Sequence, residues 1–317
     1  MSKILELENL RKEFVSKSSD QPIVAVDNIC LSLEKGKVLG IVGESGSGKS
    51  TLARLMLRLV EPTSGKITFD GIDLRNQKPD ELRRLRSRMQ MIFQDPMSSL
   101  DPRMTVRAII REPLDIHNHE NSQSREKLVE SFAEKVGIAK SALDKYPHEF
   151  SGGQRQRISI ARAVINKPDL VIADEPVSAL DLSIQAQILN LLKDLRRDLN
   201  LSFVFISHDL SVINYFADEV AVMYLGNVVE YASTPELFAR PKHPYTQALI
   251  SAIPQIVADQ RTDRLILSGD MPNPANPPTG CHFHPRCPIA VDNCSIQTPK
   301  LRSFGQNHQV SCDLVTA

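Results

Sequence analysis

The sequence predicts an α/β fold with a mainly parallel core sheet. Short, unbroken apolar runs at residues 38–42, 170–173 and 202–207 are typical of strands that are buried on both faces. A glycine-rich loop and a helix-forming stretch follow the first run, and an amphipathic helix is expected at residues 184–199, between the other two runs. Strands that alternate with helices in this way favour a parallel sheet, because each helix returns the chain to the same edge.

The other predicted elements carry weaker patterns. Strands are expected at 4–10, 23–33, 65–71 and 89–93, helices at 51–59, 80–88, 125–136 and 154–164, and polar loops at 16–22 and 115–124. The arginines within 80–88 are compatible with a nucleic-acid contact, but acidic neighbours favour a solvated helix face. His117 and His119 have no adjacent cysteine or carboxylate cluster, so we expect solvated loop residues rather than metal ligands.

Composition limits the functional classes. The 317-residue chain has a formal net charge of +0 and no strong basic patch, so no nucleic-acid partner is expected. No run approaches the roughly 18 apolar residues of a membrane span, and residues 1–10 contain no signal-peptide core. We therefore expect a cytoplasmic chain that reaches a membrane only through partners. Proline becomes dense towards the C-terminus, which predicts two domains, 1–234 and a small loop-rich domain at 235–317. Cys30 lies in an apolar stretch and is expected in the core.

A phosphate-binding loop (P-loop) of the pattern G-x-x-x-x-G-K-[ST] follows the strand at 38–42. Its residues are Gly43, Glu44, Ser45, Gly46, Ser47, Gly48, Lys49, Ser50 and Thr51. The glycines allow the backbone to fold into a nest of N–H groups, and the following helix adds partial positive charge. Lys49 can reach the β- and γ-phosphates of a nucleotide, and the Ser50 hydroxyl can bind Mg2+. The strand before the loop and the helix after it favour this interpretation over an ordinary glycine-rich turn.

An acidic pair, Asp174 and Glu175, ends the strand expected at 170–173. P-loop enzymes use a carboxylate at such a strand end to hold Mg2+. We therefore predict that Asp174 holds the ion, directly or through water, and that Glu175 polarises an attacking water molecule. Two solvated acids at a strand end are the weaker alternative beside an intact P-loop.

Further motifs accompany these two. They are Gln94, Ser151–Gln154 at the start of a helix, Ser178–Asp181, and His208 at the end of a strand. Their order and spacing resemble those of the ATP-binding-cassette (ABC) ATPases over residues 1 to about 230. The resemblance implies an ATPase that uses ATP and Mg2+. It also implies the ABC nucleotide-binding fold, in which an antiparallel β subdomain and a helical subdomain join the mainly parallel core sheet.

The resemblance gives each matching residue a role. Phe14 would stack on adenine, and Gln94 would contact Mg2+ and sense a membrane partner. Asp174 would hold Mg2+ and Glu175 would be the catalytic carboxylate. His208 would contact the γ-phosphate as the second catalytic residue.

The signature motif would complete a neighbour's site. It consists of Ser151, Gly152, Gly153 and Gln154, preceded by Phe150 where the family usually has leucine. The two glycines at a helix N-terminus form a second anion nest. In the family this nest covers the P-loop of a partner cassette, so that two cassettes enclose two ATP molecules. Asp181 belongs to the D-loop of the same arrangement.

Three segments resemble the dipeptide and oligopeptide importers within the family. They are 93–106, 243–249 and 280–288, with Cys294 and Cys312 beyond them. The resemblance implies a heterodimer with a second ATPase subunit, beneath two transmembrane permease subunits that serve an external solute-binding protein. The chain would then lie at the cytoplasmic face of the membrane as a peripheral subunit. Related members carry nickel or glutathione, and a soluble ABC ATPase outside transport is the rival class.

Four cysteines crowd the C-terminal region: Cys281, Cys287, Cys294 and Cys312. In a cytosolic chain such a group indicates metal binding before disulfides. Four thiolates suit either Zn2+ or a [4Fe-4S] cluster, and the spacing of these cysteines matches neither type of site. The resemblance to the importer subunits favours the [4Fe-4S] cluster, with a structural role.

Overall fold

The computed structural model describes residues 2–15, 22–117, 122–253, 265, 267, 269–305 and 307–316. It divides into two compact units, each built from several segments of the chain. Unit 1 comprises Met1–Leu5, Leu33–Lys37 and Phe69–Ile206, and unit 2 comprises Glu6–Ser32, Val38–Thr68 and Ser207–Ala317.

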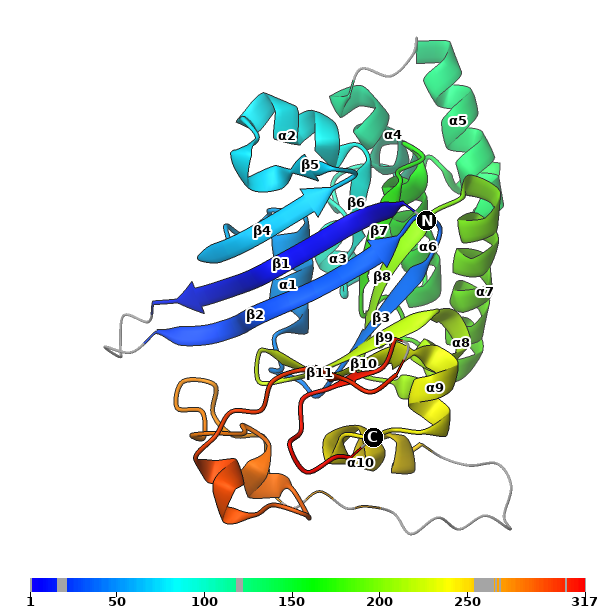
Figure 1. The fold of residues 1–317 in the computed structure, drawn as a ribbon. Helices are drawn as coiled ribbons and strands as arrows, with labels where there is room; N and C mark the ends of the chain where they lie inside the picture. The colour runs from blue at the N-terminus through cyan, green and yellow to red at the C-terminus, as the bar shows by residue number, and fades with distance from the viewer. Residues whose placement is uncertain are drawn as a thin grey trace. The chain divides into compact units, whose positions relative to one another are not determined.

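Unit 1 is built on three parallel strands (Figure 1). They are β6 (Met89–Ile92), β7 (Leu170–Asp174) and β8 (Ser202–Ser207), in the order β6-β7-β8. Every residue of β7 and β8 is buried, which explains their unbroken apolar sequences. The parallel pairing predicted for residues 170–173 and 202–207 is therefore confirmed.

Helices make up most of the remainder of unit 1. The elements are β5 (Ile72–Asp73), η1 (Leu74–Asn76), α2 (Pro79–Arg86), α3 (Pro96–Ser99), α4 (Val106–Ile116), α5 (Ser122–Lys135), η2 (Lys140–Ala142), η3 (Pro147–Glu149), α6 (Gly152–Val164) and α7 (Leu182–Leu199). Helices α4, α5 and α6 contact one another, and α6 also contacts α7 and β6. Helix α6 thus joins the helical part of unit 1 to its sheet.

The second group of strands belongs to unit 2, apart from the ends of β1, β2 and β4, which fall within the bounds of unit 1. Strand β3 (Val38–Val42) pairs in parallel with β9 (Glu219–Tyr224), and β9 continues through antiparallel β10 (Asn227–Ser233) and β12 (Gln309–Val310) to β11 (Arg302–Ser303). Strands β1 (Lys3–Phe14), β2 (Ile23–Glu34) and β4 (Ser64–Phe69) form another sheet in the order β2-β1-β4, with β1 antiparallel to both neighbours (Figure 1). The helices of unit 2 are α1 (Lys49–Met56), α8 (Leu210–Phe216), α9 (Thr234–Ala239), α10 (Pro244–Ser251), η4 (His284–Arg286) and η5 (Asp292–Ser295).

The C-terminal region is anchored in unit 2 by a buried carboxylate. Glu230 of β10 is fully buried and accepts hydrogen bonds from the N–H groups of Lys242 and His243, at 2.8 and 3.0 Å. Its Oε1 also lies 2.7 Å from Nε2 of the buried His308. Chain segments far apart in sequence therefore meet at one side chain, since a buried carboxylate requires such partners.

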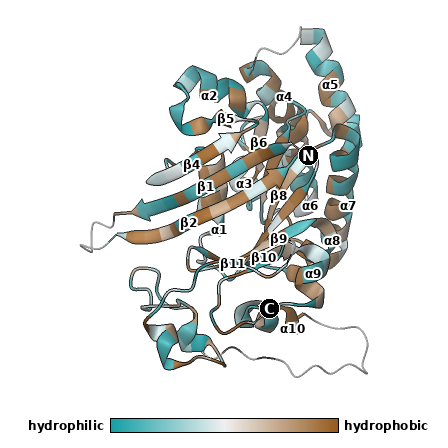
Figure 2. Ribbon diagram, in the orientation of Figure 1, coloured by the Kyte–Doolittle hydropathy of each residue, from teal (hydrophilic) through white to brown (hydrophobic). Residues whose placement is uncertain are grey.

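Most predicted elements are confirmed, with three differences. Cys30 is exposed rather than in the core, because β2 alternates between its two faces and Cys30 falls between the buried Ile29 and Leu31. Figure 2 shows this interleaving of hydrophobic and hydrophilic residues along β1 and β2. Helix α1 ends at Met56 rather than at residue 59, and α4 and α5 extend into both ends of the loop expected at 115–124. Residues 16–21 and 118–121, which include His119, lie outside the described residues.

Across the parts of the chain that the structure describes, no helix combines the length and the apolar character needed to cross a membrane.

Candidate nucleotide-binding site

The P-loop lies in unit 2, between β3 and α1. Gly48 is the N-cap of α1 with φ +101°, and a Cβ there would approach the carbonyl oxygen of Ala25 to 2.2 Å. Only glycine fits this turn, because both the backbone angle and the space exclude a side chain. The helix N-terminus is thereby directed at the concave loop, as phosphate binding requires.

Lys49 is almost fully buried within the loop that it follows, with 5% of its surface exposed. Its Nζ donates hydrogen bonds of 2.8 Å to the carbonyl oxygens of Gly43 and Glu44. The ammonium group is therefore held at the loop itself, where phosphate oxygens would also meet it.

Residues of the C-terminal region contact Glu44 of the P-loop, a contact that the sequence analysis did not predict. The hydroxyl of Tyr245 in α10 accepts a hydrogen bond from the Glu44 N–H at 2.9 Å. Nη1 of Arg286 lies 3.1 Å from both carboxylate oxygens of Glu44. The predicted importer segments 243–249 and 280–288 contain both residues, so those segments were the available signal.

Unit 1 brings together two of the predicted catalytic-site residues. The Gln94 side-chain amide donates a hydrogen bond of 3.1 Å to Oε2 of Glu175. Asp174 is buried at the end of β7, with 4% of its surface exposed. Glu175 adopts a left-handed backbone conformation with φ +47° directly after the strand, which turns the chain at this point. The three residues provide a carboxamide and two carboxylates, which are oxygen ligands suited to Mg2+.

The signature motif starts helix α6, as predicted. Ser151 is its N-cap: the Ser151 Oγ accepts from the Gln154 N–H, and the Gln154 Oε1 accepts from the Ser151 N–H at 3.0 Å. This reciprocal capping box fixes the first turn of the helix. At Gly153 a Cβ would approach Cγ2 of Ile184 to 2.6 Å, so helix α7 packs too closely for a side chain.

The remaining site residues also lie at element ends. Asp181 is the N-cap of α7, and the hydrogen bond from the Ile184 N–H lowers the pKa of its carboxyl group. His208 follows β8 and is exposed, and it belongs to unit 2. Phe14 ends β1 with 42% of its surface exposed, and the Lys12 Nζ lies 4.9 Å from the centre of its ring.

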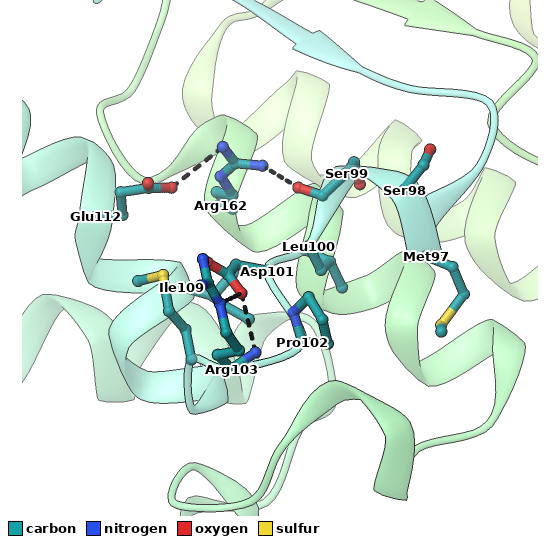
Figure 3. A pocket seen from close by; sticks show the side chains of 11 residues that line it. Met97, Ser98, Ser99, Leu100, Asp101, Pro102, Arg103, Ile109, Glu112 and Arg162 are labelled. Atoms are coloured by element: carbon teal, nitrogen blue, oxygen red, sulfur yellow. Dashed lines mark hydrogen bonds and ion pairs between the residues drawn. The ribbon is translucent and has the colours of Figure 1, made fainter.

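Residues that follow shortly after Gln94 in the sequence line a pocket of about 640 Å3. The pocket lies entirely within unit 1 (Figure 3). It is lined by residues 97–104 together with Ile109, Glu112 and Arg162. Arg162 pairs with Glu112 at 3.1 Å and donates to the carbonyl oxygen of Ser99 at 2.7 Å. These contacts connect α6 to α4 and to the end of α3, and they lie at the pocket.

The four C-terminal cysteines are free and half-buried. Burial raises the pKa of the Cys281 thiol, and the nearby Cys312, Cys287 and Cys294 raise it further. The four thiols are thus close enough to influence one another. Within the described ranges, however, no group of three or more His, Cys, Asp and Glu side chains has the geometry to hold a metal ion.

Comparison with known proteins identifies the family. Residues 26–178 match the family model described as ABC transporter, and residues 229–294 match the one described as oligopeptide/dipeptide transporter, C-terminal region. The chain is 49% identical over 319 residues to the oligopeptide transport ATP-binding protein AppF of Bacillus subtilis, a match that covers 98% of this chain and 97% of AppF. The chain belongs to the family of ATP-binding subunits of oligopeptide and dipeptide ABC transporters. As a member of this family it hydrolyses ATP to drive transport.

Other comparisons agree with this assignment. The dipeptide transport ATP-binding protein DppF of Haemophilus influenzae is 47% identical over 292 residues, or 92% of this chain and 89% of DppF. Among solved structures, the dimeric ATP-binding cassette MJ0796 in a post-hydrolysis state bound to ADP and Pi matches with a TM-score of 0.67 at 29% identity. That match covers 73% of this chain and 98% of MJ0796. The predicted ABC fold and ATPase activity are therefore confirmed.

Proposed function

We propose that this chain powers the import of peptides as one of two ATPase subunits of a membrane transporter. The observation that carries the proposal is its likeness to oligopeptide and dipeptide transport proteins over 92–98% of its length. Neither nickel nor glutathione transport, nor a soluble ABC ATPase, is indicated by these relatives. In this proposal residues 1–234 form the nucleotide-binding domain and residues 235–317 a C-terminal domain.

Within the ATP site, different residues of the chain would bind the phosphates, hold Mg2+ and activate water. Residues 43–51 would bind the phosphates through backbone N–H groups and Lys49. Ser50, Gln94 and Asp174 would provide oxygen ligands for Mg2+, which would offset charge on the phosphates. Glu175 would polarise the attacking water, and the hydrogen bond from Gln94 would orient its carboxylate. His208 would contact the γ-phosphate and Phe14 the adenine ring.

The second half of each ATP site would come from a partner ATPase subunit. The Ser151–Gln154 motif presents a capped helix start, and Asp181 caps the neighbouring helix α7. The N-terminus of α6 is suited to covering the phosphates of a nucleotide held by another chain, and Asp181 would belong to the D-loop beside it. Hence the isolated chain should hydrolyse ATP slowly. Fast turnover that is independent of protein concentration and needs no partner would contradict the shared site.

The two permease subunits would contact unit 1 next to Gln94. Phe93 and Met97 are exposed there, and the pocket lined by residues 97–104 is open beside them. Because Gln94 would ligate Mg2+, a surface directly after it could couple movement of the membrane subunits to the ATP site. The chain would in this way lie at the cytoplasmic face of the membrane, and an external binding protein would deliver the peptide to the permease.

We also propose that Cys281, Cys287, Cys294 and Cys312 hold a [4Fe-4S] cluster with a structural role. Described residues after 270 bury only two large hydrophobic side chains, Phe283 and Val310. Such a segment gains little from burial to offset the ordering entropy of roughly 1–2 kcal/mol per residue. Four thiolates on one metal group would stabilise it instead.

The resemblance to the importer subunits favours the cluster over zinc, since the spacing of the cysteines suits neither type of site better. The neighbouring thiols Cys312, Cys287 and Cys294 contribute to the raised pKa of Cys281, as expected where four thiols gather in one region.

Two experiments test the proposed function. Co-expression with permease subunits and a second ATPase subunit of a peptide transporter from the same genome should yield a membrane complex that contains this chain, with ATP turnover stimulated by peptide-loaded binding protein. Failure to assemble with any permease would refute the transport role. Anaerobic purification followed by iron, sulfide and zinc analysis tests the cluster. One zinc per chain without iron would replace it with a zinc site.

A further inference from the structure

The residue Glu44 connects the P-loop to the C-terminal region. Its carbonyl oxygen accepts from Lys49 at 2.8 Å, its N–H donates to the Tyr245 hydroxyl at 2.9 Å, and its carboxylate pairs with Arg286 at 3.1 Å. These contacts restrain the main chain and the side chain of Glu44 together. All of the residues involved belong to unit 2.

The Arg286 side chain is held firmly in place. Only 8% of it is exposed, whereas 30% of the Glu44 side chain is exposed. The preceding Phe283 is buried against Tyr224 and Tyr245, with ring centres 5.3 and 5.4 Å apart. Tyr224 and Tyr245 also pack edge to face at 4.9 Å. The aromatic cluster fixes the short helix η4 and thus the direction of Arg286.

The charge of Glu44 makes this contact important for ATP. A carboxylate in the phosphate loop repels the phosphates of the nucleotide, because like charges at short range disfavour one another. A buried guanidinium paired with that carboxylate cancels most of the repulsion. An exposed lysine or arginine would do so less well, since solvent and salt would screen it.

We propose that Arg286 is a positioning residue of the ATP site, which neutralises and orients the Glu44 carboxylate so that the P-loop keeps its affinity for ATP. The C-terminal region then takes part in nucleotide binding, beyond any role as a separate domain. The proposal rests on the proposed binding of ATP at residues 43–51.

The test is MgATP binding to the full-length chain by isothermal titration calorimetry. Arg286→Met keeps the apolar stem of the side chain and removes its charge. We expect the Kd for MgATP to rise roughly threefold to tenfold, as for a partly screened charge next to several phosphate charges. The double variant Glu44→Gln/Arg286→Met should return to within about twofold of wild type, because no uncompensated carboxylate remains. Arg302→Met, on an exposed arginine of the same region that pairs with Asp313 at 3.5 Å, is the matched control and should bind normally.

The double variant separates electrostatics from structure. It lacks the Arg286 contacts as fully as the single variant, so a merely structural role would leave both variants equally weak. That result, or wild-type affinity in Arg286→Met, overturns the proposal. In the assembled transporter the single variant should raise KM for ATP and leave kcat unchanged, because uniform binding is lost. If the wild-type chain fails to bind MgATP, the proposed ATP site fails instead.

Discussion

Acidification should destabilise the C-terminal part of unit 2 through His243. Burial lowers the pKa of this histidine from 6.5 to about 3. His243 is the N-cap of α10, and its Nδ1 accepts the Tyr245 N–H at 3.1 Å. A proton on Nδ1 would break this bond and place a charge in a buried position, so the native state excludes it.

Proton linkage gives the direction and the magnitude of the change in unfolding free energy with pH. Between about pH 3 and 6.5 the unfolded chain binds a proton that the native chain does not, so stability falls as the pH falls through this range. Above 6.5 neither state binds the proton, and the contribution is constant. Integrating from pH 7 to pH 5 with these two pKa values gives a loss of roughly 2 kcal/mol of unfolding free energy from this one residue.

The assay is urea unfolding followed by far-UV circular dichroism, since the chain contains no tryptophan. His243→Asn is the comparison, because asparagine keeps a capping acceptor and does not titrate in this range. The other titratable groups are the same in both proteins. The difference in the pH dependence of their unfolding free energies therefore gives the contribution of His243. If wild type and His243→Asn lose the same unfolding free energy between pH 7 and pH 5, His243 does not cause the loss of stability in acid.

Three further predictions concern single residues. Glu175→Gln should bind ATP normally but turn over at least about a hundredfold more slowly in the assembled transporter, since an amide cannot accept a proton from water; wild-type turnover would remove Glu175 from catalysis. Gly48→Ala should abolish measurable ATP binding, because the new Cβ would meet the Ala25 carbonyl oxygen at 2.2 Å; calorimetry that shows unchanged affinity would contradict the strained turn. Glu230→Ala should lower the unfolding free energy by roughly 3 kcal/mol or more, because it leaves two backbone N–H groups and His308 without their acceptor; a urea midpoint equal to that of wild type would show that water replaces the carboxylate.

The P-loop and the acidic pair could be predicted because their geometry is local. The phosphate-binding nest after β3 is formed by nine consecutive residues. The position of Asp174 is set by the strand that it ends. The capping box of Ser151 and Gln154 is equally local. For such sites, the spacing of the residues along the chain is enough to predict their local geometry.

Cys30 shows where apolar content alone misleads. The stretch around it is apolar on average, but β2 alternates between a buried and an open face, and Cys30 falls on the open face. Period-2 alternation was the better signal, because one step along a strand moves a side chain to the opposite face. The neighbouring Ile29 and Leu31 follow the same rule and are buried.

The contacts of Arg286 and Tyr245 could not be predicted, because they are non-local. Arg286 and Glu44 are 242 positions apart in the chain. No periodicity or spacing links residues at that separation, and both segments are rich in turn-forming residues. The division of the chain into interleaved units has the same origin, because each unit gathers segments from distant parts of the sequence.

The identity of Glu44 is itself explained by this distant contact. The phosphate-binding pattern leaves its position open to any residue, so phosphate binding does not require an acid there. A carboxylate next to anionic phosphates is on electrostatic grounds an unfavourable choice. Pairing with Arg286 would cancel most of this repulsion, and the ion pair also connects the C-terminal region to the P-loop. Glutamate at this position is therefore best understood as one half of an ion pair whose other half, Arg286, directly precedes Cys287.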